Sequence, residues 1–350
     1  MFSNLMDITQ FIMTIIVGLY FFTQLTGISE SKSGIGAESK SELERLNFMR
    51  RNHLSVPLTE ETRPTSLGEI VGQEDGVKAL IIALGGDNPQ HILIYGPPGV
   101  GKTAAARVAL EYVKKSGHTA FSKDAPFIEV DATTMHYDER SIADPLIGSV
   151  HDPIYQGAGA YGNIGAPQVK EGAVSRAHGG VLFVDEIGEL CSVQINRLLK
   201  VLEDRKVMFT SSYYSKSNKS IPRHVHDIFK NGMPADFRLI GATTRRPDEI
   251  PDAIRSRCVE IFFRPLNEND LFSIAQGAAG KLNVSFDDSV CRMVARLSKN
   301  GRDCVKIMSM LASKAEFENR SSAEYDDVEW LLRTGSFNLN RPQRMDFDAG

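Results

Sequence analysis

Three short apolar runs in the middle of the chain have the length and composition of buried β-strands. They span residues 90–95, 179–184 and 237–244, and each ends at glycine, acidic or hydroxyl residues. Runs of this length, bounded by turn residues, are typical of buried strands. From Glu268 to about Arg333, after Pro265, the pattern of apolar positions becomes helical. The chain is therefore predicted to have strands in its centre and a helical region towards its end.

The first apolar stretch is much longer and carries no charge. Between Ile8 and Leu25 only threonine and glutamine interrupt it, and aromatic residues stand at 20–22. A helix of about 20 such residues spans a bilayer core, with aromatic side chains at its interface. A cleaved signal peptide would need a basic start, and a buried core helix would be isolated before a polar linker. We predict a transmembrane anchor over residues 1–28 and a linker over 29–60.

The charges beside this segment predict its orientation. Basic residues follow the anchor and none precedes it. Because lysine and arginine are retained on the cytoplasmic side, the sequence predicts a single-pass membrane protein whose C-terminal bulk lies in the cytoplasm. The basic residues concerned are Lys32, Lys40, Arg45, Arg50 and Arg51.

Composition argues against two kinds of site. The net charge is −4, with no basic stripe, so no nucleic-acid partner is expected. The four cysteines form no C-x-x-C pair and no zinc-type cluster with histidine, which indicates reduced thiols. They are Cys191, Cys258, Cys291 and Cys304.

The first apolar run leads directly into a phosphate-binding motif. A G-x-x-x-x-G-K-T sequence follows it and opens onto an alanine-rich stretch that favours helix. Glycines let backbone N–H groups wrap phosphates, and the helix N-terminus adds its dipole. Lys102 would reach the β- and γ-phosphates, and the Thr103 hydroxyl would ligate Mg²⁺. We predict ATP and Mg²⁺ as cofactors, bound by Gly96, Pro97, Pro98, Gly99, Val100, Gly101, Lys102 and Thr103.

Two acids end the second apolar run, and two threonines end the third. Ligands of parallel sheets lie at the carboxyl ends of the strands, so these residues are expected to face the phosphate loop. Asp185 would hold Mg²⁺ through water, and Glu186 would orient or deprotonate the attacking water. Thr244 is the first candidate to contact that water or the γ-phosphate, with Thr243 second. The alternatives are that the acids cap a helix and the threonines only terminate a strand.

Together these motifs resemble the AAA+ superfamily of P-loop ATPases. The resemblance implies an α/β fold, with a parallel sheet between helices over 61–265, a small α-helical lid over 266–334, and a tail over 335–350. The segment 70–73 resembles the family's adenine-side segment. The segment 250–258 resembles its arginine-finger motif, which gives Arg257, with Arg255 as neighbour, a role at the next subunit's γ-phosphate. Arg302 corresponds to the second sensor arginine, or alternatively is a solvated helix-cap residue.

The resemblance is strongest to membrane-anchored LonB ATP-dependent proteases of endospore-forming bacteria. It rests on residues 148–155 and 176–187 and on the N-terminal apolar segment. It implies a homohexamer that unfolds protein substrates and passes them to a protease chamber. A glycine-rich insertion at 146–162 and a second one near 208–236 resemble pore loops. Tyr155 or Tyr161 would grip the threaded polypeptide, unless it only packs within its loop.

One feature departs from that family. No serine–lysine dyad can be assigned after the lid, so the resemblance extends to the ATPase and not to the peptidase. A separate protease component is one way to supply the missing step. Two other kinds of motor stay open: a non-proteolytic remodelling chaperone related to metal chelatases, and a nucleic-acid motor, since branch-migration helicases share the Gly-Ala-Thr-Thr and Ser-Arg-Cys elements.

Overall fold

A computed structural model of the chain describes residues 13–21, 42–51, 57–135, 144–151, 168–211, 214–217 and 221–334. Two compact units divide it, Met1–Pro57 and Leu58–Gly350. In the first unit, residues 13–21 and 42–51 are helical and exposed. The second of these helices falls within the predicted linker. It is rich in glutamate, leucine and arginine, which favour helix.

The predicted anchor lies only partly within the described residues. Its helical part is 13–21, and residues 1–12 and 22–28 lie outside. No helix in the described part of the chain has both the length and the apolar character needed to cross a bilayer. The transmembrane anchor stays a prediction.

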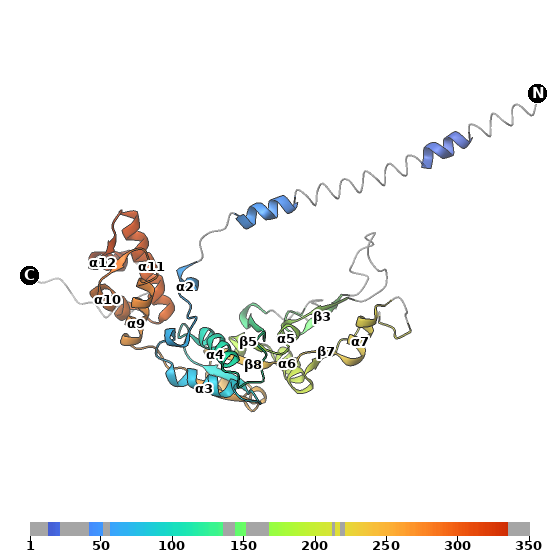
Figure 1. The fold of residues 1–350 in the computed structure, drawn as a ribbon, viewed down its shortest axis with the longest axis horizontal. Coiled ribbons are helices and arrows are strands. Elements are labelled where there is room, and N and C mark those ends of the chain that lie inside the picture. The colour runs from blue at the N-terminus through green and yellow to red at the C-terminus, as the bar shows by residue number, and fades with distance from the viewer. Residues whose placement is uncertain are drawn as a thin grey trace, which may run out of the picture. The chain divides into compact units, whose positions relative to one another are not determined.

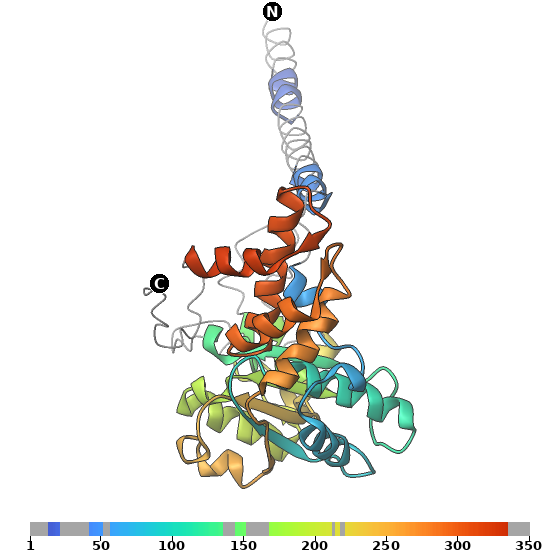
Figure 2. The same ribbon diagram turned by 90° about the vertical axis from the view of Figure 1, so that its left-hand side faces the viewer.

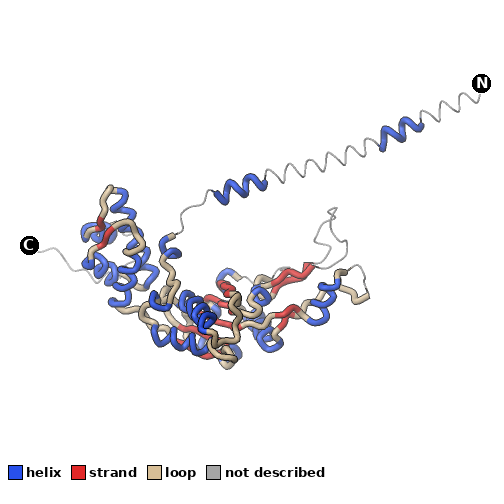
Figure 3. The backbone as a smooth tube through the Cα atoms, viewed as in Figure 1, coloured by secondary structure: helices blue, strands red, loops and turns tan. Residues whose placement is uncertain are grey.

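A five-stranded parallel sheet forms the centre of the second unit, as the sequence predicts (Figures 1 and 3). Its order is β2-β5-β8-β1-β9, and every neighbouring pair is parallel. The three predicted strands are therefore the central ones, and their carboxyl ends meet at one edge. The strands are β1 His91–Tyr95, β2 Phe127–Asp131, β5 Val181–Asp185, β8 Arg238–Thr243 and β9 Cys258–Phe262.

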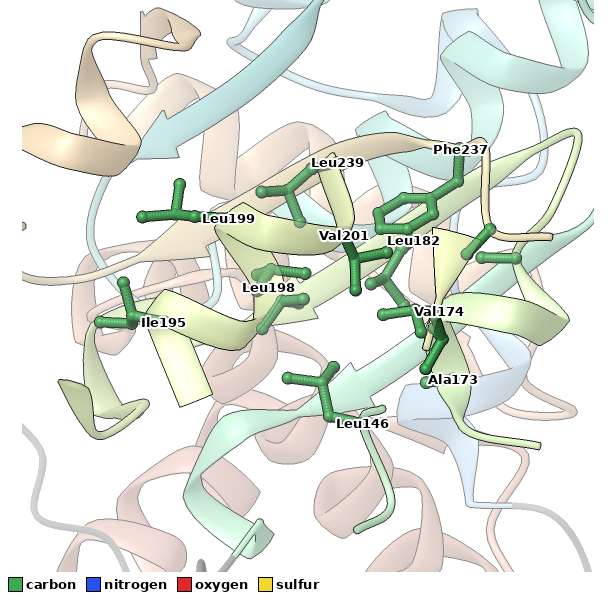
Figure 4. Packing of buried hydrophobic residues seen from close by; sticks show 14 of the residues in the cluster. Leu146, Ala173, Val174, Leu182, Ile195, Leu198, Leu199, Val201, Phe237 and Leu239 are labelled. Atoms are coloured by element: carbon green, nitrogen blue, oxygen red, sulfur yellow. The ribbon is translucent and has the colours of Figure 1, made fainter. Parts of the chain in front are cut away.

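Helices cover both faces of this sheet because side chains alternate along each strand. Ile92 and Ile94 of β1 join the core beneath α3 and α4. Leu93 joins the opposite core, where side chains from α5, α6 and β5 gather in one layer (Figure 4). The helices are α3 Glu74–Leu84, α4 Lys102–Ser116, α5 Ala173–Arg176, α6 Ser192–Asp204 and α8 Asp252–Arg255, with short 3-10 turns η1 Leu67–Glu69, η2 Ala132–Thr134, η4 Ile187–Glu189 and η5 Pro247–Glu249.

Two insertions project from this subdomain as antiparallel pairs of strands. The first pairs β3 Gly148–His151 with β4 Gln168–Glu171. Tyr155 and Tyr161, the predicted pore residues, lie between these strands and outside the described residues. The second insertion pairs β6 Lys206–Val207 with β7 Met233–Pro234 and carries α7 Arg223–Asn231.

A small helical subdomain follows, as predicted (Figure 2, orange and red). It has a core of its own, which includes Leu271, Val294, Ile307 and Leu331. Leu58 also packs against this core, so the end of the predicted linker belongs structurally to the lid. The elements are α2 Leu58–Glu61, α9 Glu268–Ala279, α10 Asp288–Leu297, α11 Gly301–Phe317 and α12 Tyr325–Arg333, with β10 Ser285–Phe286 parallel to β11 Ser322–Ala323.

Candidate active site

The phosphate loop follows β1 and wraps around a buried lysine. Lys102 begins α4, is 7% exposed, and donates hydrogen bonds to the carbonyl oxygens of Gly96 at 2.7 Å and Pro97 at 3.1 Å. The preceding residue, Gly101, has φ +93°, a left-handed conformation that glycine adopts without strain. The loop thus curls over the ammonium group at the N-terminus of a fifteen-residue helix, whose dipole favours anions there.

Electrostatics place four predicted site residues around this point. Burial lowers the pKa of Lys102, the Glu186 and Asp185 carboxylates oppose that shift, and the Arg302 charge adds to it. Asp185 shows the reciprocal effect, because burial and then the Glu186 charge raise its pKa. Lys102, Asp185, Glu186 and Arg302 therefore lie close enough for their charges to interact.

The structure joins the ends of β5 and β8 through Glu186 and Thr244. Oε2 of Glu186 accepts hydrogen bonds from the Thr244 backbone N–H at 3.0 Å and from its hydroxyl at 3.1 Å. Glu186 has φ +48° and ψ +49°, a left-handed conformation that costs a non-glycine residue about 1–2 kcal/mol. This strained turn directs the Glu186 side chain towards the neighbouring strand, which fixes the carboxylate in one place.

Thr243, the second candidate, has a different environment. Its side chain is fully buried, its hydroxyl accepts a hydrogen bond from the Arg245 N–H at 3.1 Å, and its carbonyl accepts one from the Gly96 N–H at 3.2 Å. These bonds tie the end of β8 to the start of the phosphate loop. The geometry thus gives Thr244 the contact with Glu186 and gives Thr243 a structural one.

Two further contacts at this edge are absent from the sequence predictions. Asp131 ends β2 directly beside Asp185, and its charge contributes to the raised Asp185 pKa. Arg245 donates two hydrogen bonds, at 2.7 and 3.1 Å, to Oε1 of Glu189 in η4. The available signals were the acid that closes 127–131 and the arginine directly after the threonine pair.

The lid contacts the phosphate loop directly. The Gly301 N–H donates to the Gly99 carbonyl oxygen at 3.1 Å. A Cβ on Gly99, which has φ +72°, would stand 2.7 Å from the Asn300 side-chain oxygen. Asn300 caps α11, so the first turn of that helix, which carries Arg302, is held against the loop. Arg302 itself is exposed.

The predicted arginine finger lies on α8 and the turn after it, where it has partners of its own. Arg257 pairs with Glu203 of α6 and donates to the Ala253 carbonyl oxygen at 2.7 Å. Arg255, its neighbour, pairs instead with Glu260 of β9 at 2.8 Å. The two arginines thus face different partners, and Arg257 is the more exposed of the two.

The residues proposed for Mg²⁺ suit a site in which the protein supplies only some of the metal ligands. Within the residues that the structure describes, no group of three His, Cys, Asp or Glu side chains is arranged to hold a metal ion. Mg²⁺ in nucleotide sites takes one or two protein oxygens and completes its shell with phosphates and water. The Thr103 hydroxyl and the Asp185 carboxylate are oxygen donors of that kind.

Comparison with known sequences finds relatives at two levels of likeness. The family model described as magnesium chelatase, subunit ChlI, matches residues 66–221. Lon protease 2 of Bacillus subtilis (strain 168) is 54% identical over 336 residues. The match covers 96% of this chain and 61% of that protein, so the chain spans less than two thirds of its relative.

Two solved structures share the fold at low sequence identity. Thermotoga maritima RuvB, a Holliday junction branch migration motor, has a TM-score of 0.52 and 20% identity, over 78% of this chain and 72% of that one. NtrX from Brucella abortus in complex with ADP has a TM-score of 0.50 and 18% identity, over 83% of this chain and 59% of that one. With the phosphate loop and the acids at the sheet edge, these findings show that the chain has the fold of an AAA+ ATPase module and is a close homologue of Lon protease 2 over 96% of its own length.

Proposed function

We propose that the chain hydrolyses ATP to unfold and translocate protein substrates, as the motor of Lon-type ATP-dependent proteolysis. The observation that carries this is the 54% identity to Lon protease 2 over 96% of the chain. The site geometry supports the hydrolytic step, because the Glu186 carboxylate is held by Thr244 beside the charges of Lys102 and Asp185.

The residues at the sheet edge divide the chemistry of the proposed reaction. Lys102 and the loop N–H groups would bind the β- and γ-phosphates, while Thr103 and Asp185 would hold Mg²⁺, which neutralises charge on the transferred phosphoryl group. Glu186 would orient the attacking water and take its proton, with Thr244 setting the direction of the carboxylate. Arg302, carried by the lid, would report the state of the γ-phosphate to the small subdomain.

An oligomeric ring completes the proposed site. Arg257 lies on an exposed turn and pairs with Glu203 of α6. We propose a homohexamer in which Arg257 reaches the nucleotide of the adjacent subunit and stabilises charge in the transition state. The insertions around β3–β4 and β6–β7 would line the pore, with Tyr155 or Tyr161 contacting unfolded protein.

The proposed setting of the motor is a membrane surface. The exposed helix 13–21 is apolar, and lysine and arginine residues follow it while none precedes it, which supports a single-pass anchor with the ATPase on the cytoplasmic side. Peptide-bond cleavage would be supplied by a protease domain or a separate protease component.

The decisive experiment follows a fluorescently labelled unfolded protein incubated with the purified chain and ATP. Turnover of ATP that is stimulated by the unfolded protein, and lost in Lys102→Ala, would support the motor. Release of labelled peptides would reveal a peptidase in the preparation. ATP turnover that ignores unfolded protein would contradict the proposed substrate class.

Specific observations favour two other motors enough to test them together with the first. The fold of RuvB supports a nucleic-acid motor, although the chain has a net charge of −4. The chelatase family match over residues 66–221 supports a remodelling chaperone with one dedicated partner. Stimulation of ATP turnover by duplex or junction DNA, and not by unfolded protein, would favour the nucleic-acid motor. A stable complex with one partner and no affinity for unfolded chains would favour the remodelling chaperone.

A further inference from the structure

A single carboxylate on edge strand β9 joins the phosphate loop to the helix of the predicted arginine finger. Oε1 of Glu260 accepts a hydrogen bond from the Tyr95 hydroxyl at 3.0 Å and another from Nε of Arg255 at 2.8 Å. Tyr95 is the last residue of β1 and immediately precedes Gly96. Arg255 is the last residue of α8, two positions before Arg257. One oxygen atom thus links the two functional segments.

The tyrosine side of this link is rigid. Tyr95 is 3% exposed, and its ring stacks on that of Phe262, with centroids 5.1 Å apart and planes 16° from parallel. The same two residues are register partners between β1 and β9. Burial, together with the hydrogen bond to Glu260, raises the pKa of Tyr95 to about 12, so the phenol stays a donor at neutral pH. A shift of the end of β1 beside the phosphate loop would therefore displace the Glu260 carboxylate through its hydrogen bond with Tyr95.

The arginine side of the link matters because α8 is short. Four residues cannot hold a helix in place by their own hydrogen bonds, so its orientation depends on side-chain contacts. The hydrogen bond from Arg255 lowers the pKa of Glu260, which keeps this acceptor ionised. The other partner of Arg255 is Asp252, whose Oδ1 lies 3.2 Å from Nη1 of the arginine. The Asp252 side chain is 96% exposed, so this is a solvated surface ion pair that contributes little.

We propose that Glu260 is a positioning residue for hydrolysis in the neighbouring subunit: it holds α8 on β9 so that Arg257 is presented to that subunit's γ-phosphate, and through Tyr95 it links this presentation to the conformation of its own phosphate loop. The proposal rests on the proposed function, in which Arg257 acts across a subunit interface. It assigns roles to Glu260 and Tyr95, which the proposed function does not place among the nucleotide-binding residues.

The first test separates turnover from binding. Glu260→Ala in the full chain is expected to lower kcat about tenfold, because small displacements of a catalytic group cost that much or more, while KM for ATP and the affinity for a fluorescent ADP analogue stay unchanged. Asp252→Asn is the matched control, since it removes an exposed partner of the same arginine, and its kcat should stay within about twofold of wild type. A rise in KM or weaker ADP binding in Glu260→Ala would overturn the proposal.

The second test uses mixed oligomers to show where Glu260 acts. Lys102→Ala chains cannot use ATP but keep the finger, and Arg257→Ala chains keep the nucleotide site but lack the finger. Mixing the two should restore turnover, because the first chain supplies Arg257 to the second. Adding Glu260→Ala to the Lys102→Ala chain should lower the recovered turnover about tenfold, as in the first test. Adding Glu260→Ala to the Arg257→Ala chain instead should leave it intact, since that chain has no finger to position.

The two arrangements contain the same substitutions, so a general loss of stability affects both alike. If both lose recovery, or both keep it, Glu260 is not a positioning residue for the finger, although Arg257 would still act in trans. If the parent mixture of Lys102→Ala and Arg257→Ala shows no recovery at all, the trans-acting role of Arg257 in the proposed function is wrong.

Discussion

At the scale of single residues, the position of the Glu186 carboxylate depends on Thr244. The backbone N–H and the hydroxyl of Thr244 both donate hydrogen bonds to Oε2 of Glu186. Neither of these two bonds uses Oε1, the other oxygen of the carboxylate. A carboxylate fixed by two donors can be displaced only at the cost of both hydrogen bonds. The Glu186 carboxylate would therefore already be oriented when nucleotide and water bind at this edge of the sheet.

Removing the charge of Glu186 tests its role directly. Glu186→Gln is expected to bind ATP with unchanged affinity and to lower kcat by about 100-fold or more, since the amide cannot accept the proton of the attacking water. Binding is measured with a fluorescent ATP analogue and turnover by phosphate release, with Lys102→Ala as the variant that fails to bind. Normal turnover in Glu186→Gln would mean that the base assignment is wrong.

The two threonines at the end of β8 make a matched pair of variants. Thr244→Val removes the hydroxyl that donates to Glu186 and should lower kcat about tenfold with KM unchanged, which is the effect of losing one hydrogen bond to a charged group. Thr243→Val removes a hydroxyl that accepts a hydrogen bond from the Arg245 N–H and should change kcat much less. The reverse order of effects would assign the sensing role to Thr243.

At the scale of elements, the join between β1 and β8 depends on a neutral histidine. His91 begins β1, and its Nδ1 accepts a hydrogen bond from the Leu239 N–H at 3.0 Å, which is possible only for the unprotonated nitrogen. Burial, with a smaller contribution from the charge of Arg238, lowers the pKa of His91 to about 4. Asp236 opposes this shift and Arg205 adds to it.

This lowered pKa predicts a loss of stability in mild acid. Above the ordinary value of 6.5 both the folded and unfolded forms are neutral, so the stabilising contribution is complete. As pH falls from 6.5 to about 4, the unfolded chain gains a proton that the fold resists, which costs about 3 kcal/mol. Chemical denaturation of wild type and His91→Gln between pH 7.5 and 4 measures it. The glutamine variant, whose amide oxygen still accepts the bond, should lose less stability; identical curves would contradict the assignment.

Elements differ in how far the sequence specifies them. The strands β1, β5 and β8 are buried on both sides, so their apolar runs are continuous and predictable. The outer strands β2 and β9 were not predicted, because they lie at the sheet edges, half-exposed, and β9 carries the exposed side chains of Val259 and Phe262. Because Glu186 and Thr244 follow the carboxyl ends of two parallel strands, the sequence predicted that both would face the phosphate loop. Their hydrogen bond also required the left-handed turn at Glu186, for which the sequence gives no signal.

At the scale of the whole molecule, the lid and the phosphate loop form one connected structure. The bond between Gly301 and Gly99 joins α11 to the loop, and the Asn300 side chain occupies the space that a Cβ on Gly99 would need. Gln73 adds a second link, since its side chain bonds both backbone groups of Arg264, just before the lid begins. Nucleotide held by the loop therefore has a direct mechanical route to the lid.

A buried ion-pair cluster around Asp327 stabilises the lid internally. Asp327 is 2% exposed and accepts hydrogen bonds from Lys314 at 2.5 Å and Arg320 at 2.6 Å. Burial alone would raise the pKa of Asp327, but these bonds and one from the Glu324 N–H outweigh it and hold the pKa at about 2. Asp327→Asn is expected to lower the free energy of unfolding by about 3 kcal/mol, because two cations lose their buried partner. Equal denaturation midpoints for variant and wild type would contradict this.

The division of the chain at Pro57 predicts that anchoring and nucleotide binding are separable. Residues 58–350 form a compact unit with the whole candidate site, whereas the predicted anchor and most of the predicted linker belong to the first unit. A chain that starts at Leu58 is therefore expected to bind a fluorescent ADP analogue as tightly as the full chain, within about twofold, since no phosphate contact is removed.

Membrane association is expected to depend on the first unit. When expressed in bacteria, the full chain should sediment with membranes and resist extraction by salt and alkali, because an apolar span is held by hydrophobic transfer. The shortened chain should remain in the supernatant. A full chain carrying Ile15→Asp and Val17→Lys is the matched control: if these charges release it while leaving ADP binding intact, the segment around 13–21 is the anchor, and if the shortened chain still sediments with membranes, another surface of the ATPase unit must bind them.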